Sequence, residues 1–177
     1  MNRSKKLVRN LVIILVILWI FYYYGGYYIS KQQCVIETLR GHYATETREV
    51  MEVRQGNYIA TLMADENNES FSIVGTKKTG ILYRTASSSV GNKVDKEKSM
   101  TMSGMGSSDY GIIICIYRND KSIAKVEVQL ENGDTYLITD WKEDYAWYVR
   151  TGDDDWSCGT YRAYNAKGEQ VGEEMYY

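Results

Sequence analysis

The feature that constrains this chain most is a long uncharged stretch directly after a basic N-terminal tip. No charged side chain occurs between Arg9 and Lys31. A helix needs about 20 apolar residues to cross a bilayer core of about 30 Å. The range 10–30 has that length, and its second half is rich in tyrosine, which is typical of a membrane interface. The sequence therefore predicts a transmembrane helix over 10–30.

A cleaved signal peptide is the alternative interpretation of this segment. Signal peptides carry an apolar region of about 7–15 residues and a small-residue cleavage site. Here the apolar run is longer, and Gly25 and Gly26 are the only small residues among the aromatic side chains of 21–28. A permanent anchor is therefore favoured, and cleavage is left open.

The basic tip also predicts an orientation. Lysine and arginine next to a membrane helix are enriched on the cytoplasmic side, and the tip meets no acidic residue before Glu37. We therefore expect a single-pass signal-anchor protein of the cell membrane, with 1–9 in the cytoplasm and 31–177 extracytoplasmic.

The charge of the remaining chain excludes one class of partner. The net charge is −2 although the tip is basic, and 131–177 holds 11 acidic but only 4 basic side chains. An acidic surface of this kind disfavours nucleic acid and anionic lipid headgroups. No nucleic-acid partner is expected.

Beyond the uncharged stretch the pattern changes from helix to strand. The range 31–44 has apolar residues at helical spacing and predicts a short juxtamembrane amphipathic helix. From 45 onward apolar and polar residues alternate, and 111–117 is a continuous apolar run suited to a sheet interior. The step Asn132-Gly133 is a strong hairpin signal. The stretch 87–98 lacks apolar periodicity and predicts a loop.

These patterns predict a mainly β fold. Short strands separated by turns at regular spacing are typical of a sandwich or barrel. We therefore expect one antiparallel β-sandwich or barrel-like domain over 45–177, preceded by the helices at 10–30 and 31–44.

Three segments carry a resemblance to a known group of proteins. They are GIIICIYRNDKSIAKVEVQLENGDTY, WKEDYAWYV and TYRAYNAKGEQV. This pattern resembles small membrane-anchored extracytoplasmic β-domain proteins of Gram-positive bacteria, over most of 31–172. The resemblance implies a helix followed by a meandering β domain in the cell envelope, and it implies no catalytic residue.

Several kinds of catalytic or metal site are disfavoured by the residues present. The single histidine, His42, makes a Ser-His-Asp or Cys-His triad improbable. The cysteines Cys34, Cys115 and Cys158 are too widely separated for the ligand spacing of a zinc site. Three cysteines allow one disulfide, for which Cys34–Cys158 is the preferred pair, and its formation is left open. No metal or cofactor is expected.

Aromatic and acidic side chains in the last part of the chain form the candidate binding site. Tyrosine and tryptophan provide flat surfaces for a cationic or carbohydrate ligand. Alternate residues of YAWYV must face the core, so some of these aromatics are structural. The candidate binding residues are Tyr145, Trp147, Asp153, Asp154, Asp155 and Trp156.

The function expected from the sequence is noncatalytic: an envelope interaction or ligand-binding module, held at the membrane through 10–30 and working with another envelope or membrane protein. One alternative is a cell-wall hydrolase with paired carboxylates, for which the available acids are Glu127, Asp140, Glu143 and Asp144. Another is an accessory subunit whose membrane helix packs through Gly25 and Gly26.

Overall fold

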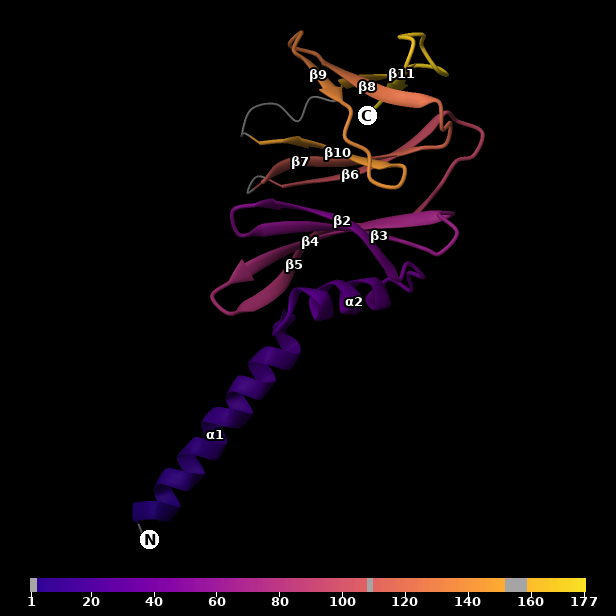
Figure 1. Ribbon diagram of the computed structural model, residues 1–177. Helices are drawn as coiled ribbons and strands as arrows, with labels where there is room; N and C mark the ends of the chain where they lie inside the picture. Colours follow the sequence, from indigo (N-terminus) through magenta and orange to yellow (C-terminus); the bar gives the residue numbers. More distant parts are fainter. Residues whose placement is uncertain (1–2, 108–109, 152–158) are drawn as a thin grey trace.

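The computed structural model describes residues 3–107, 110–151 and 159–177 (Figure 1). Within them the chain forms two helices and twelve strands. In chain order these are α1 (Arg3–Tyr24), β1 (Tyr27–Tyr28), α2 (Lys31–Gly41), β2 (Arg48–Gln55), β3 (Tyr58–Ala64), β4 (Ser70–Thr79), β5 (Leu82–Lys93), β6 (Met100–Ser107), β7 (Gly111–Arg118), β8 (Ile123–Leu130), β9 (Thr135–Ile138), β10 (Tyr145–Arg150), β11 (Gly159–Asn165) and β12 (Met175–Tyr176).

The first helix corrects the predicted membrane segment. α1 projects away from the rest of the molecule (Figure 1) and ends at Tyr24. Gly26 then turns the chain with φ 63°, and β1 pairs with β5. The last residues of the predicted range 10–30 are therefore not helical. α1 begins with the charged residues of 3–9, so its uncharged part covers only 10–24, which is shorter than the roughly 20 residues needed for a bilayer.

No helix in the described part of the chain is long and apolar enough to span a membrane. The predicted transmembrane helix over 10–30 is therefore wrong. The single-pass signal-anchor topology and the location at the cell membrane depended on that helix, and they are contradicted with it.

The second helix covers one face of the β structure. Ser30 caps α2, because its hydroxyl accepts a hydrogen bond from the Gln33 N–H at 3.1 Å. Val35 and Leu39 on its inner face pack against Met63 of β3 and its neighbours. α2 therefore lies as an amphipathic layer against the sheet that contains β3 (Figure 1).

The strands form three antiparallel sheets that stack on one another (Figure 1). The helix-side sheet has the order β1-β5-β4-β3-β2, the middle sheet β10-β7-β6, and the outer sheet β12-β11-β8-β9. The mainly β, antiparallel part of the predicted fold is confirmed. The arrangement is a stack of three sheets covered by a helix.

The middle sheet is buried on both faces, which explains its apolar sequence. On β7, Ile113, Cys115 and Tyr117 belong to the core shared with the helix-side sheet. Ile114 and Ile116 belong to the core shared with the outer sheet. A strand that packs on both sides cannot alternate apolar with polar residues, so β7 is the continuous run predicted as an interior strand.

β5 corrects the predicted loop over 87–98, because it extends to Lys93. Its inward side chains are hydroxyls rather than apolar groups. Ser87 contacts the Tyr110 hydroxyl, and Ser89 Oγ lies 2.8 Å from Ser103 Oγ. Hydrogen bonds between sheets replace apolar contacts here, which removes the periodicity that would have predicted a strand.

Candidate functional site

A groove lies where the edges of all three sheets meet. β2 is an edge strand of the helix-side sheet, β10 of the middle sheet and β9 of the outer sheet. The groove has a volume of about 760 Å³, within the usual range of about 300–1,000 Å³ for ligand pockets. It is lined by Met51 and Glu52 of β2, by Trp147, Tyr148 and Val149 of β10, and by 136–142.

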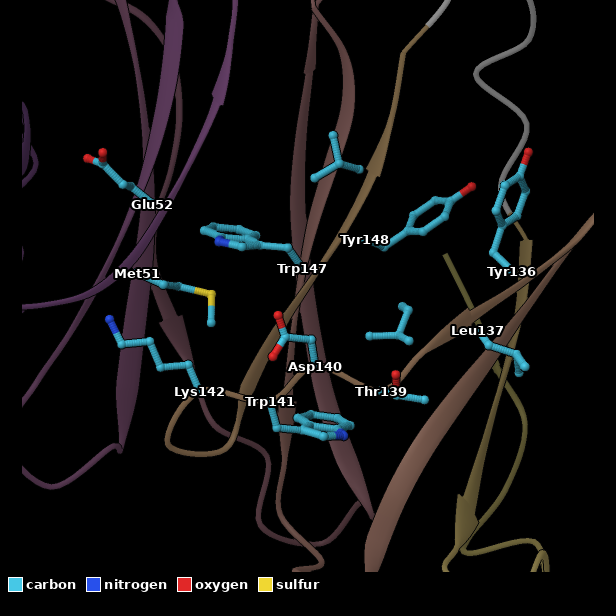
Figure 2. Close-up of a pocket in the computed structure, with 12 residues that line it drawn as sticks. Met51, Glu52, Tyr136, Leu137, Thr139, Asp140, Trp141, Lys142, Trp147 and Tyr148 are labelled. Carbon is cyan, nitrogen blue, oxygen red and sulfur yellow. The ribbon is translucent and has the colours of Figure 1, made fainter.

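β10 divides the groove into two halves. Successive side chains of a strand point to opposite faces, so Trp147 points toward Met51 of β2 while Tyr148 points toward Tyr136 of β9 (Figure 2). The rings of Tyr136 and Tyr148 meet edge to face, with centroids 5.8 Å apart. Each half of the groove therefore has an aromatic wall supplied by the same short strand.

Two buried polar atoms in these walls have no hydrogen-bond partner among the described residues. They are Nε1 of Trp147 and the hydroxyl of Tyr148. The Tyr148 side chain is only 6% exposed. A buried donor without a partner costs about 1–3 kcal/mol, and such groups concentrate where a ligand or water completes the site. Burial raises the pKa of Tyr148, so its hydroxyl stays protonated and available as a donor.

The backbone of β10 also presents unpaired groups to the groove. The Arg118 N–H donates to the Asp144 carbonyl at 2.9 Å, and Tyr145 exchanges two bonds with Lys142 on the opposite side. The direction of backbone hydrogen bonding alternates along a strand. The N–H and C=O groups of Trp147 and Val149 therefore point away from β7, as those of Tyr145 do. Among the described residues no backbone partner satisfies their N–H and C=O groups on that side.

The loop between β9 and β10 holds one wall of the groove in place. The Trp141 indole N–H donates to the Ala124 carbonyl at 3.0 Å, and the Arg118 guanidinium lies 4.9 Å from the Trp141 ring centre. Arg118 also donates to Asp144 Oδ1 at 3.0 Å. Glu143 and Asp144 have φ of 58° and 148°, a backbone arrangement that non-glycine residues rarely adopt. The surrounding contacts therefore fix a strained loop that carries part of the site.

The charged groups at the groove are of mixed sign. The Lys31 ammonium binds Glu52 Oε2 at 2.6 Å, and this hydrogen bond lowers the pKa of Glu52. Asp140 and Lys142 also line the groove and are exposed. Glu52 therefore remains ionised at neutral pH, which suits charge recognition better than proton donation.

The acids named for the hydrolase alternative do not converge on the groove. Glu127 lies 3.6 Å from Arg162 on the outer sheet. Glu143 pairs with Arg48, and Asp144 pairs with Arg118. Only Asp140 of the four lines the groove. Three of the four acids are therefore held in ion pairs with arginines outside the groove.

The structure separates the candidate binding residues predicted from the sequence. Trp147 lines the groove. Tyr145 lies in the core between the helix-side and middle sheets, where its hydroxyl donates to Asn68 Oδ1 at 3.2 Å and burial raises its pKa. The remaining four, Asp153, Asp154, Asp155 and Trp156, lie outside the described residues.

Sequence reasoning missed the other groove residues because they come from separate elements. Met51, Tyr136 and Trp141 are far apart along the chain, and only the meeting of three sheet edges brings them together. The one local signal is the Asp140-Trp141 step, which places an acid next to an aromatic ring just before β10.

The cysteines and potential metal ligands of the described residues give no further site. Cys34 is a buried free thiol 3.5 Å from Thr85 Oγ1, and Cys115 is a buried free thiol in the core. Cys158, the other half of the disulfide left open, lies outside the described residues. No three His, Cys, Asp or Glu residues of the described ranges are grouped to hold a metal ion.

Comparisons with protein-family models, curated proteins and solved structures gave no match to this chain. The resemblance to Gram-positive β-domain proteins therefore stays a prediction from the sequence.

Proposed function

We propose that this protein is a noncatalytic binding module that holds an extended polypeptide segment in the groove by adding it as a strand to β10. The observation that carries this proposal is that the backbone N–H and C=O groups of Trp147 and Val149 point away from β7. Between them they offer two backbone donors and two backbone acceptors, spaced as in a strand, inside an aromatic groove.

An extended peptide complements these groups better than other ligands do. In strand addition, main-chain hydrogen bonds supply affinity, and pockets for alternate side chains supply specificity. The groove has this arrangement, because Trp147 lies on one face of β10 and Tyr148 on the other (Figure 2). Alternate side chains of the ligand then enter the two aromatic halves.

The neighbouring bridge defines where the added strand begins. Lys142 already occupies the outer side of Tyr145 through bonds of 2.8 and 2.9 Å. The uncovered part of the β10 edge therefore starts at Trp147, next to the 139–142 loop that lines the same groove. Because the loop carrying Lys142 is held by Arg118 and Trp141, this end of the site is preorganised, which reduces the entropy lost on binding.

The test uses two peptides with the same side chains and the full-length protein. The first is an acetylated, amidated hexapeptide of alternating valine and threonine, and the second is the same peptide N-methylated at alternate residues on one edge. Loss of the main-chain donors should weaken binding about tenfold, since a net hydrogen bond is worth about 0.5–1.5 kcal/mol. Equal affinity for the two peptides would contradict the proposal.

A protein variant tests the same bonds from the other side. Val149→Pro removes the outward N–H without removing a ladder bond to β7, and proline is tolerated at such edge positions. We expect it to weaken binding of the unmethylated hexapeptide about tenfold. Val149→Ala is the matched control, because it shortens the side chain but keeps the N–H, and it should retain most of the affinity. A Val149→Pro protein that binds as tightly as Val149→Ala would contradict strand addition.

A further inference from the structure

A second pocket lies at the C-terminal end of α2, separate from the groove. It has a volume of about 530 Å³ and is bounded by α2, by the connection from α2 to β2, and by β3. Its apolar floor includes Leu39 and Met63, which are buried between α2 and the helix-side sheet. It is therefore an apolar hollow that opens to solvent beside a helix terminus.

A buried carboxylate lines this apolar pocket. Glu46 is only 4% exposed, and among the described residues it is the one charged side chain that is buried. Its Oε2 has no hydrogen-bond partner in the described part of the chain. Buried charges are normally paired, because an isolated one is strongly disfavoured in an apolar environment. The pocket thus contains a negative group with an unfilled acceptor position.

The neighbouring cation does not fill that position. Arg40 also lines the pocket, but its guanidinium binds Glu37 Oε1 at 2.7 Å and is largely exposed. The C-terminal end of α2 adds partial negative charge from its last carbonyls. The electrostatics of the pocket therefore favour a positively charged ligand.

An exposed aromatic ring stands at the mouth of the pocket. Tyr43 is 94% exposed and has φ 56°, a conformation that is uncommon for a tyrosine. Its N–H donates to the Arg40 carbonyl at 3.1 Å, which fixes the turn that follows α2. A tyrosine held in this way offers its face to a cation.

We infer that this pocket binds a primary alkylammonium group. The ammonium donates to Glu46 Oε2, the aliphatic stem lies against Leu39 and Met63, and the Tyr43 ring covers the charge. A compact ammonium can use the one buried oxygen Oε2, whereas a guanidinium pairs with both carboxylate oxygens in one plane. A divalent cation such as Ca²⁺ needs about six or more oxygen ligands, which this apolar lining does not supply.

Titration of the full-length protein with n-butylammonium, followed through the methyl resonances of Leu39 and Met63, tests this inference. The neutral comparison is n-butanol, which has the same stem. We expect n-butylammonium to bind about tenfold more tightly than n-butanol, since hydrogen bonds to charged groups are the stronger ones. Equal binding of the two probes would overturn the inference.

Substitutions assign the effect to the carboxylate. Glu46→Gln keeps the size of the side chain and should abolish the preference for n-butylammonium over n-butanol. Glu66→Gln, at an exposed acid outside the pocket, is the matched control and should leave that preference unchanged. An unchanged preference in Glu46→Gln would overturn the inference.

A second variant covers the case in which Glu46→Gln fails to fold. Tyr43→Leu changes an exposed side chain, and loss of its ring should weaken n-butylammonium about threefold while leaving n-butanol unchanged. If Glu46→Gln does not fold and Tyr43→Leu binds n-butylammonium as tightly as the unchanged protein, the inference is overturned.

The same titration identifies the source of the ammonium group. N-acetyl-lysine N-methylamide carries the group on a polypeptide side chain, whereas n-butylammonium represents a free amine. Binding of both probes supports a lysine side chain as the natural ligand, and binding of n-butylammonium alone supports a free amine. Binding of neither overturns the inference.

Discussion

At the scale of single residues, the groove depends on two neighbours that point in opposite directions. Trp147 and Tyr148 follow each other on β10 and line different halves of the groove (Figure 2). Each carries a buried polar atom without a partner among the described residues. In the free protein these atoms cost stability, and a ligand that supplies acceptors removes that cost. The two side chains therefore favour a bound state over an empty one.

The unpaired hydroxyl of Tyr148 leads to a prediction about stability. Tyr148→Phe removes a buried polar group that has no partner, so the free energy of unfolding should stay unchanged or rise by up to about 1 kcal/mol. Tyr145→Phe is the matched control, because Tyr145 donates to Asn68, and it should lose about 1 kcal/mol. Urea unfolding measures both variants. A larger loss for Tyr148→Phe than for Tyr145→Phe would show that the Tyr148 hydroxyl is satisfied.

At the scale of elements, the packing of β7 follows directly from its sequence. The apolar run 111–117 predicts an interior strand, and the structure places it in the middle sheet between two cores. The turn at Asn132-Gly133 could also be predicted from the local sequence. Gly133 has φ 90°, and the Leu130 N–H donates to the Asp134 carbonyl across the hairpin. By contrast, the second half of β5 (87–93) could not be predicted, because its inward hydroxyls are satisfied by partners on another sheet.

Because β7 is buried on both faces, truncating a side chain on either face should lower the free energy of unfolding. Ile113 packs toward the helix-side sheet and Ile114 toward the outer sheet. Ile113→Ala and Ile114→Ala should each lower the free energy of unfolding by about 2–5 kcal/mol, the usual cost of such a truncation in a core. Chemical denaturation measures both. A two-layer sandwich would expose one of these faces, so a loss below about 1 kcal/mol in either variant contradicts the three-sheet stack.

The contact between α2 and β2 should depend on pH. Lys31 of α2 binds Glu49 and Glu52 of β2, and the hydrogen bond from Lys31 lowers the pKa of Glu52 below its ordinary value of 4.5. The stabilisation is therefore complete above pH 4.5 and is lost as pH falls through the lowered pKa. Because the pair is partly exposed, its contribution is at most about 1 kcal/mol.

Lys31→Met tests this pH dependence. It should reduce the difference in the free energy of unfolding between pH 6 and pH 3 by up to about 1 kcal/mol. Lys96→Met, at an exposed lysine that pairs with Glu69, is a control for loss of a surface charge. An identical pH dependence in the unchanged protein and in Lys31→Met would show that the α2–β2 pair contributes nothing.

At the scale of the whole molecule, the groove arises from topology. Its walls come from 51–52, 136–138 and 147–149 on three different sheets, and from the loop 139–142 between β9 and β10. Alternation within each strand can be predicted from the sequence, but the stacking that brings three edges together cannot. The first segment shows the same limit, since its charge pattern suggested a membrane span, whereas the helix ends at Tyr24 and Gly26 turns the chain into β1.

Amide hydrogen exchange along β10 tests the central claim most directly. In the free protein, the outward amides of Trp147 and Val149 should exchange quickly, while the amide of Tyr148, bonded to β7, should exchange slowly. Addition of the valine–threonine hexapeptide should slow exchange at Trp147 and Val149 about tenfold or more and leave Tyr148 unchanged. Unchanged exchange at Trp147 and Val149 with the peptide bound would contradict strand addition at this edge.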